Sequence, residues 1–160
     1  FLYFFYIYYM SNTIKKNKIT NKKTLKKTLK NNNIIQNGNF QKNICIHFMK
    51  MLNCIKLYHW KTRFKSHHDA TDELHDKLLT NFDRFMEIIV GKSNFNFTNV
   101  CFECIKIPSK NKFKQEVNKF INYLIGLNEK LNKKIDTDLI AINDEIIGDL
   151  NKFKYSIRLK

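Results

Sequence analysis

Apolar residues recur at three- and four-residue spacing in four stretches of the chain, a spacing typical of amphipathic helices. We expect helices over residues 41–62, 66–91, 111–131 and 137–159. Residues 92–108 lose this period and predict a long connection or a short pair of strands. The pattern as a whole predicts an all-α fold, a four-helix bundle with a long crossover between its second and third helices.

Capping residues predict where two of these helices begin or end. Ser66 is a candidate N-cap for the second helix, and Asp69 would then lie in its first turn. Gly91 is a candidate C-terminal stop of that helix. Asp136 is the expected N-cap of the last helix.

The composition changes this picture mainly at the N-terminal end. A chain of 160 residues with 43% hydrophobic residues, 4 Gly and 1 Pro is expected to form one packed domain. We place this domain at residues 41–160 and an unpacked segment at residues 1–40. The first ten residues, FLYFFYIYYM, are apolar but too few for a membrane span, which needs about 20. They lack the features of a secretory signal, and we expect the native start at Met10.

Charge is distributed unevenly along the chain. The first 68 residues contain 14 of the 29 Lys and Arg residues and no acidic residue, whereas residues 69–160 contain the other 15 and all 14 acidic residues. We therefore expect residues 11–33 to form a flexible basic arm. Its lysines could bind nucleic-acid phosphates without reading sequence, or the arm could be a solubilising tail of a compositionally biased gene. The lysines concerned are Lys15, Lys16, Lys18, Lys22, Lys23, Lys26, Lys27 and Lys30.

The four cysteines favour a reduced, cytoplasmic protein, because no export signal is recognisable. Cys101 and Cys104 form a C-x-x-C pair, and Cys45 and Cys54 lie nine residues apart in the first helix. A four-cysteine zinc site has poor geometry with this spacing. A zinc-stabilised interaction module using Cys101 and Cys104 remains a weaker alternative.

Candidate chemistry concentrates on one flank of the second helix. At about 100° per residue, four polar residues lie within roughly 100° of one another, beside the apolar stripe. They are His68, Asp72, Asp83 and Glu87. Carboxylates and imidazoles beside apolar side chains are costly unless something compensates them, and a divalent metal would do so.

The two halves of this group are too far apart to hold one ion within a single helix. Their centres are about 15 residues apart, or roughly 22 Å along the axis. Two copies of the helix, packed antiparallel about a two-fold axis, would bring each half against the other half of the partner and create two identical sites. His59, near the end of the first helix, could add a ligand. Mixed imidazole and carboxylate ligands suit iron, with Mn or Zn as competitors.

These residues resemble the signature of the Dps-like mini-ferritins, the DNA-protecting relatives of ferritin. In that family a His-Trp pair is followed by a His, an Asp four residues later, an Asp eleven beyond and a Glu four further on. This chain has His59-Trp60 and then the four residues above at those intervals. Residues 136–159 are similar to the family's closing helix, and residues 58–91 are also similar to small proteins encoded by large DNA viruses and phages.

The resemblance implies an iron-binding ferroxidase that oxidises Fe(II) with peroxide or dioxygen at a mononuclear or di-iron centre. The ligands would come from two subunits: His59, His68 and Asp72 from one, and Asp83 and Glu87 from its two-fold mate. Trp60 would sit beside the centre and absorb stray oxidising equivalents. The resemblance also implies a homo-oligomer, a dimer within a twelve-subunit shell that stores iron and protects DNA, in a cytoplasm or, for a viral protein, the host cytoplasm or virion. No membrane partner is expected.

One alternative of a different class stays open. The chain could be a non-enzymatic protein that binds or packages nucleic acid on a ferritin-like scaffold whose metal site has lapsed. Its basic arm would then be the functional element.

Overall fold

The computed structural model divides the chain into two units, Phe1–Asn33 and Ile34–Lys160. The structure describes residues 34–93, 99–102 and 104–158, all within the second unit. The basic arm and its lysines lie outside the described residues. The second unit begins earlier than the domain boundary expected from sequence, since Ile35 is buried in the core.

The described residues form four α-helices and no strand. They are α2 (Gly38–Lys61), α3 (Lys65–Lys92), α4 (Lys110–Lys130) and α5 (Thr137–Ser156). The prediction of an all-α four-helix bundle is therefore confirmed. For residues 92–108 the sequence predicted either a long connection or a short pair of strands. The described parts of the α3–α4 connection, residues 99–102 and 104–109, contain no strand and therefore agree with the first alternative.

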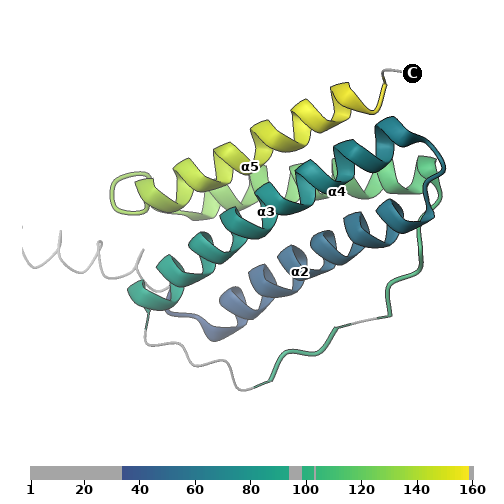
Figure 1. Ribbon diagram of the computed structural model, residues 1–160. Coiled ribbons are helices and arrows are strands. Elements are labelled where there is room, and N and C mark those ends of the chain that lie inside the picture. Colours follow the sequence, from purple (N-terminus) through teal and green to yellow (C-terminus); the bar gives the residue numbers. More distant parts are fainter. Residues whose placement is uncertain (1–33, 94–98, 103, 159–160) are drawn as a thin grey trace, which may run out of the picture. The chain divides into compact units, whose positions relative to one another are not determined.

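Each helix packs against two neighbours, in the order α2, α3, α5, α4 around the bundle. Helices α2 and α5 run in one direction, and α3 and α4 run in the other (Figure 1). The described parts of the α3–α4 connection run beside α2 (Figure 1).

Aromatic residues from three helices fill the centre of the core. Phe48 of α2 stacks on Phe82 of α3 with ring centroids 4.1 Å apart, and Phe85 and Phe120 meet its edge at 5.2 and 6.1 Å. Side chains of this kind contribute about 1.5–3 kcal/mol each when they leave water. The apolar stripe of α3 is buried along its whole length, so the other faces of the helix are turned outward. The stripe consists of Leu74, Leu78, Phe82, Phe85 and Ile89.

The helix ends differ from the predictions in two places and agree with them in a third. Ser66 is not the cap of α3, because the helix already begins at Lys65 and Phe64 occupies the N-cap position without a side-chain cap. Gly91 is helical with no positive φ, and α3 continues to Lys92. Asp136 does occupy the N-cap position of α5, but its carboxylate accepts a hydrogen bond from the Asn132 backbone N–H at 2.9 Å and pairs with Lys92.

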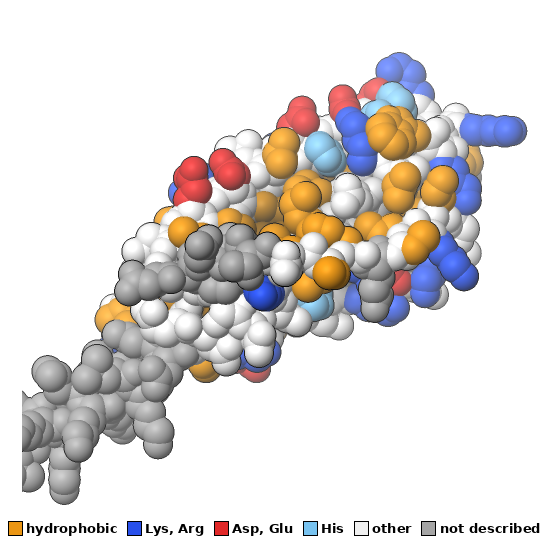
Figure 2. All heavy atoms as spheres, turned by 90° about the horizontal axis from the view of Figure 1, so that it is seen from below, with side chains coloured by type: hydrophobic (Ala, Val, Ile, Leu, Met, Phe, Trp, Pro, Cys, Tyr) orange, Lys and Arg blue, Asp and Glu red, His pale blue; other side chains and the backbone are white. Residues whose placement is uncertain are grey.

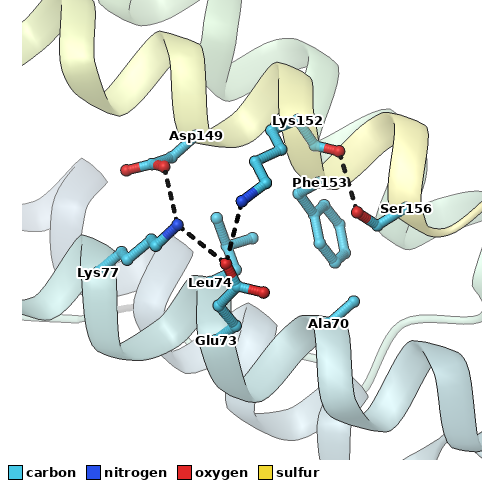
Figure 3. A pocket seen from close by; sticks show the side chains of 8 residues that line it. All are labelled: Ala70, Glu73, Leu74, Lys77, Asp149, Lys152, Phe153 and Ser156. Carbon is cyan, nitrogen blue, oxygen red and sulfur yellow. Dashed lines mark hydrogen bonds and ion pairs between the residues drawn. The ribbon is translucent and has the colours of Figure 1, made fainter.

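The seam between α3 and α5 is closed by ion pairs. Lys77 contacts Glu73 at 2.9 Å and Asp149 at 3.5 Å, and Lys152 reaches Glu73 at 3.3 Å (Figure 3). The hollow beside them has a volume of about 20 Å³, room for about one water molecule. This cluster therefore joins the helices and offers no space for a ligand.

No helix among the described residues is long and apolar enough to cross a membrane.

Candidate metal centre

Two histidines meet where α2 ends and α3 begins. The turn between the helices is only three residues long, so the last turn of α2 lies against the first turns of α3. The rings of His59 and His68 stack with centroids 3.7 Å apart. His59 is buried, while His68 is exposed.

Backbone carbonyls orient both imidazoles. The Nδ1 atom of His59 lies 3.1 Å from the carbonyl oxygen of His68, and the Nδ1 atom of His68 lies 3.3 Å from the carbonyl oxygen of His59. A carbonyl oxygen can only accept, so both Nδ1 atoms carry the proton and donate it. Each ring then keeps its lone pair on Nε2, the arrangement that prepares a neutral histidine to bind a metal.

Asp72 adds a carboxylate to these two rings. It follows His68 by one helical turn, and its Oδ1 lies 3.9 Å from the Nε2 atom of His59. Lys56 of α2 donates a hydrogen bond to the same oxygen at 3.1 Å. This hydrogen bond and the charge of Lys56 lower the pKa of Asp72, so the carboxylate is ionised at neutral pH. The Lys56 ammonium group would thus compete with a metal ion for this carboxylate oxygen.

The other two predicted ligands, Asp83 and Glu87, lie away from the corner formed by His59, His68 and Asp72. Asp83 and Glu87 lie further along α3, one turn apart, and both are exposed. Neither forms an ion pair with the described part of the chain. The carboxylates on this flank are open to water in the single chain, so the expected desolvation cost would arise only if a partner covered the flank.

Within the described residues, no group of three or more His, Cys, Asp or Glu side chains is arranged to hold a metal ion. This includes the cysteines: Cys101 and Cys104 are exposed, while Cys54 is buried in α2. One chain therefore brings His59, His68 and Asp72 close together without completing a site, and it keeps Asp83 and Glu87 apart from them.

Three other residues near this corner show what sequence reasoning found and missed. Trp60 is 69% exposed on the outside of α2. His67 is buried, and its two ring nitrogens contact the Tyr58 hydroxyl and the carbonyl oxygen of Ile157. Thr71 was not singled out, yet its buried hydroxyl lies 3.1 Å from the Nδ1 atom of His59.

Replacing Lys56 by Ala is expected to tighten binding of a divalent metal by roughly two- to fivefold, because an exposed ion pair that competes with the metal is removed. Calorimetric titration of the full chain with Co²⁺ at neutral pH would measure this. Lys65→Ala is the matched control, since Lys65 pairs with Asp69 at 3.0 Å near the same end of α3. Equal affinity in the Lys56 variant and the wild type, or an equal gain in the control, would contradict the competition.

A family model described as a family of unknown function (DUF5856) matches residues 59–157. The matched range begins at His59 and contains all five predicted ligands and Trp60. No curated protein and no solved structure matches the chain.

Proposed function

Because the chain belongs to DUF5856, a family of unknown function, we propose its activity from the site itself: it is a ferroxidase of the Dps type that oxidises Fe(II) at a centre shared between two subunits. The observation that carries the proposal is the corner of His59, His68 and Asp72. Two imidazoles, whose Nδ1 atoms donate to backbone carbonyls, and an ionised carboxylate lie together where α2 meets α3. They would supply half of a mixed nitrogen and oxygen ligand set.

The second half of the site would come from a partner chain. In an antiparallel pairing of two α3 helices about a two-fold axis, Asp83 and Glu87 of one chain approach His68 and Asp72 of the other. The midpoint of this pairing falls near Leu79, which is 49% exposed. In this pairing Asp83 and Glu87, which form no ion pair within the described part of the chain, would serve as ligands.

Exposed apolar side chains support such an interface. Met49 and Trp60 of α2 and Leu79 and Val90 of α3 all belong to the exposed large hydrophobic residues. Hydrophobic side chains gather across the middle of the face seen in Figure 2, with acidic side chains along one edge. Contiguous apolar surface of this kind often marks a protein interface.

The helix directions support the ferritin-like part of the proposal. Helices α3 and α4 are parallel, and the described parts of the segment between them run beside α2 (Figure 1). A ferritin-like bundle with one long crossover would be expected to have these directions. In those proteins the ligands also project from paired helices of the bundle.

Iron is the substrate in this reaction. Two Fe(II) ions lose one electron each to hydrogen peroxide, which takes up two protons and yields two water molecules. The residues of the chain hold the ions and leave coordination positions for the oxidant. Dioxygen could replace peroxide, and Mn or Zn would compete for the same ligands.

Anaerobic titration with Fe(II), followed by peroxide, tests the proposal. We expect saturable binding at two equivalent sites per dimer and a rapid rise of ferric absorbance after peroxide, while light scattering reports the mass of the assembly. A folded dimer that binds no Fe(II) would contradict the ferroxidase and favour the alternative, a protein that binds nucleic acid through its basic arm. Deleting residues 11–40 would then abolish a DNA mobility shift.

A twelve-subunit shell and protection of DNA belong to the same proposal. The first 68 residues carry basic side chains and no acidic ones, so the arm can bind phosphates. DNA affinity that falls steeply with salt would support this role.

A further inference from the structure

A cavity of about 590 Å³ lies between α2, α4 and the described end of the α3–α4 connection. It lies on the α4 side of α2, and none of its lining residues belongs to the candidate metal centre. The volume falls within the range of about 300–1,000 Å³ that is usual for small-molecule sites. The cavity is therefore large enough for a ligand, unlike the small hollow between α3 and α5.

The inner wall of this cavity is apolar. It includes Met51 and Cys54 of α2 and Phe120 of α4, all buried. Burial, together with the charge of Glu116, raises the pKa of the Cys54 thiol to about 11, so this side chain is neutral at physiological pH. Tyr123 adds an aromatic ring that stacks in parallel on His47. A ligand that fits this wall must have an apolar body.

The rim of the cavity is basic. Four lysines line it: Lys50, Lys106, Lys112 and Lys119. Glu116 is the one acidic lining residue among those described, and it bridges Lys112 at 3.4 Å and Lys119 at 3.1 Å. Although burial opposes the change, hydrogen bonds from these two lysines lower the pKa of Glu116, so it stays ionised. Four positive charges against one negative charge favour an anionic group on the ligand.

The hollow continues along α2. A second cavity of about 270 Å³ shares His47, Lys50 and Ile105 with the first. It adds Ile46 and Phe102, both apolar, to the wall. The lining residues of the two cavities follow α2 from Ile46 to Cys54 and the described residues 101–102 and 104–109 of the connection. A linear apolar chain fits this lining better than a compact anion does.

We propose that this cavity binds an anionic amphiphile of the fatty-acid class, with its carboxylate at the lysine rim and its alkyl chain along the apolar wall. The proposal is independent of iron oxidation, since the two sites share no residue. Each can therefore fail without the other.

Calorimetric titration of the full chain with decanoate tests the proposal. We expect saturable binding of one decanoate per chain below its micelle concentration. Decyltrimethylammonium, which has a chain of the same length but the opposite charge, should bind at least about tenfold more weakly. No saturable decanoate binding, or equal affinity for both probes, would overturn the assignment.

A pair of charge reversals at the rim locates the site. Lys106→Glu with Lys112→Glu is expected to weaken decanoate binding about tenfold or more. The variant should fold, because Glu at position 112 is three residues after the N-cap Ser109, where it can form a capping box. Lys133→Glu with Lys134→Glu changes the net charge equally outside the cavity and should alter affinity less than about twofold.

A third variant separates loss of the site from loss of the fold. Ile107 lines the cavity but is 54% exposed, so Ile107→Trp can fill the entrance without disturbing the core. We expect weaker decanoate binding with unchanged helical circular dichroism. Unaltered affinity in both the rim and the entrance variants, or an equal loss in the Lys133/Lys134 control, would refute the location.

Discussion

Two inactive variants of this chain are expected to restore iron oxidation to each other when they are refolded as a mixture. One carries His68→Ala and Asp72→Ala, and the other carries Asp83→Ala and Glu87→Ala. Each variant alone should lose rapid peroxide-driven oxidation by about 100-fold or more, because half of every shared site lacks its ligands. In a mixed dimer, the intact half of one chain meets the intact half of the other.

The size of the recovery is fixed by symmetry. Random pairing makes about half of all dimers mixed, and each mixed dimer has one complete site of two, so about a quarter of the wild-type activity should return. Stopped-flow measurement of ferric absorbance would check this. A mixture of His68→Ala with Asp72→Ala chains is the control and should stay inactive, since both changes remove the same half. Full activity in either double variant, or no recovery in mixtures shown to contain mixed dimers, would exclude a shared site.

The sequence could predict the helices of the bundle because their apolar spacing follows burial directly. The stripe from Leu74 to Ile89 is buried as expected, and this alone turns His68, Asp72, Asp83 and Glu87 to the outside of α3. The same pattern could not show whether the two halves meet, because that depends on a second chain. The interface therefore stays a prediction.

Capping residues predicted the helix ends less well than apolar spacing predicted the helices. Ser66 has a good capping side chain, but the short turn after Lys61 lets α3 begin one residue before it, with Phe64 in the cap position. The aromatic ring of Phe64 contacts His67 and lies under the ammonium group of Lys110, 4.8 Å away. Contacts of this kind are not visible in a capping pattern.

His67 was within reach of sequence reasoning. It precedes Phe85 by 18 residues, or five turns of an ideal helix, so the two share one face. The structure accordingly buries both residues.

The buried His67 joins three elements of the bundle. Its Nε2 lies 3.1 Å from the carbonyl oxygen of Ile157 at the end of α5, and its Nδ1 lies 2.8 Å from the Tyr58 hydroxyl of α2. Because the carbonyl only accepts, Nε2 carries the proton and Nδ1 accepts from Tyr58. The network is therefore satisfied by the neutral ring, and a second proton would set two donors against each other.

His67→Gln is expected to lower the free energy of unfolding by about 2–3 kcal/mol at pH 7.5, since the Tyr58 hydroxyl and the Ile157 carbonyl lose their partner in the core. Urea unfolding followed by circular dichroism would measure it. Tyr58→Phe, which removes one hydrogen bond and keeps the imidazole, should cost about 1 kcal/mol. If His67→Gln lost less unfolding free energy than Tyr58→Phe, the histidine would not link α3 to α5.

The same residue should make stability depend on pH. Burial lowers the pKa of His67, and the charges of Lys110 and Lys114 act in the same direction, although the hydrogen bond to Ile157 opposes them. As pH falls below the unfolded value of about 6.5, the unfolded chain takes up the proton before the folded chain does. The contribution of His67 is therefore complete above that value and decreases below it, by at most about 1.4 kcal/mol per pH unit. Between pH 7.5 and 5.5 the wild type should lose more stability than His67→Gln, and equal losses would mean that the pKa of His67 is the same in the folded and unfolded chains.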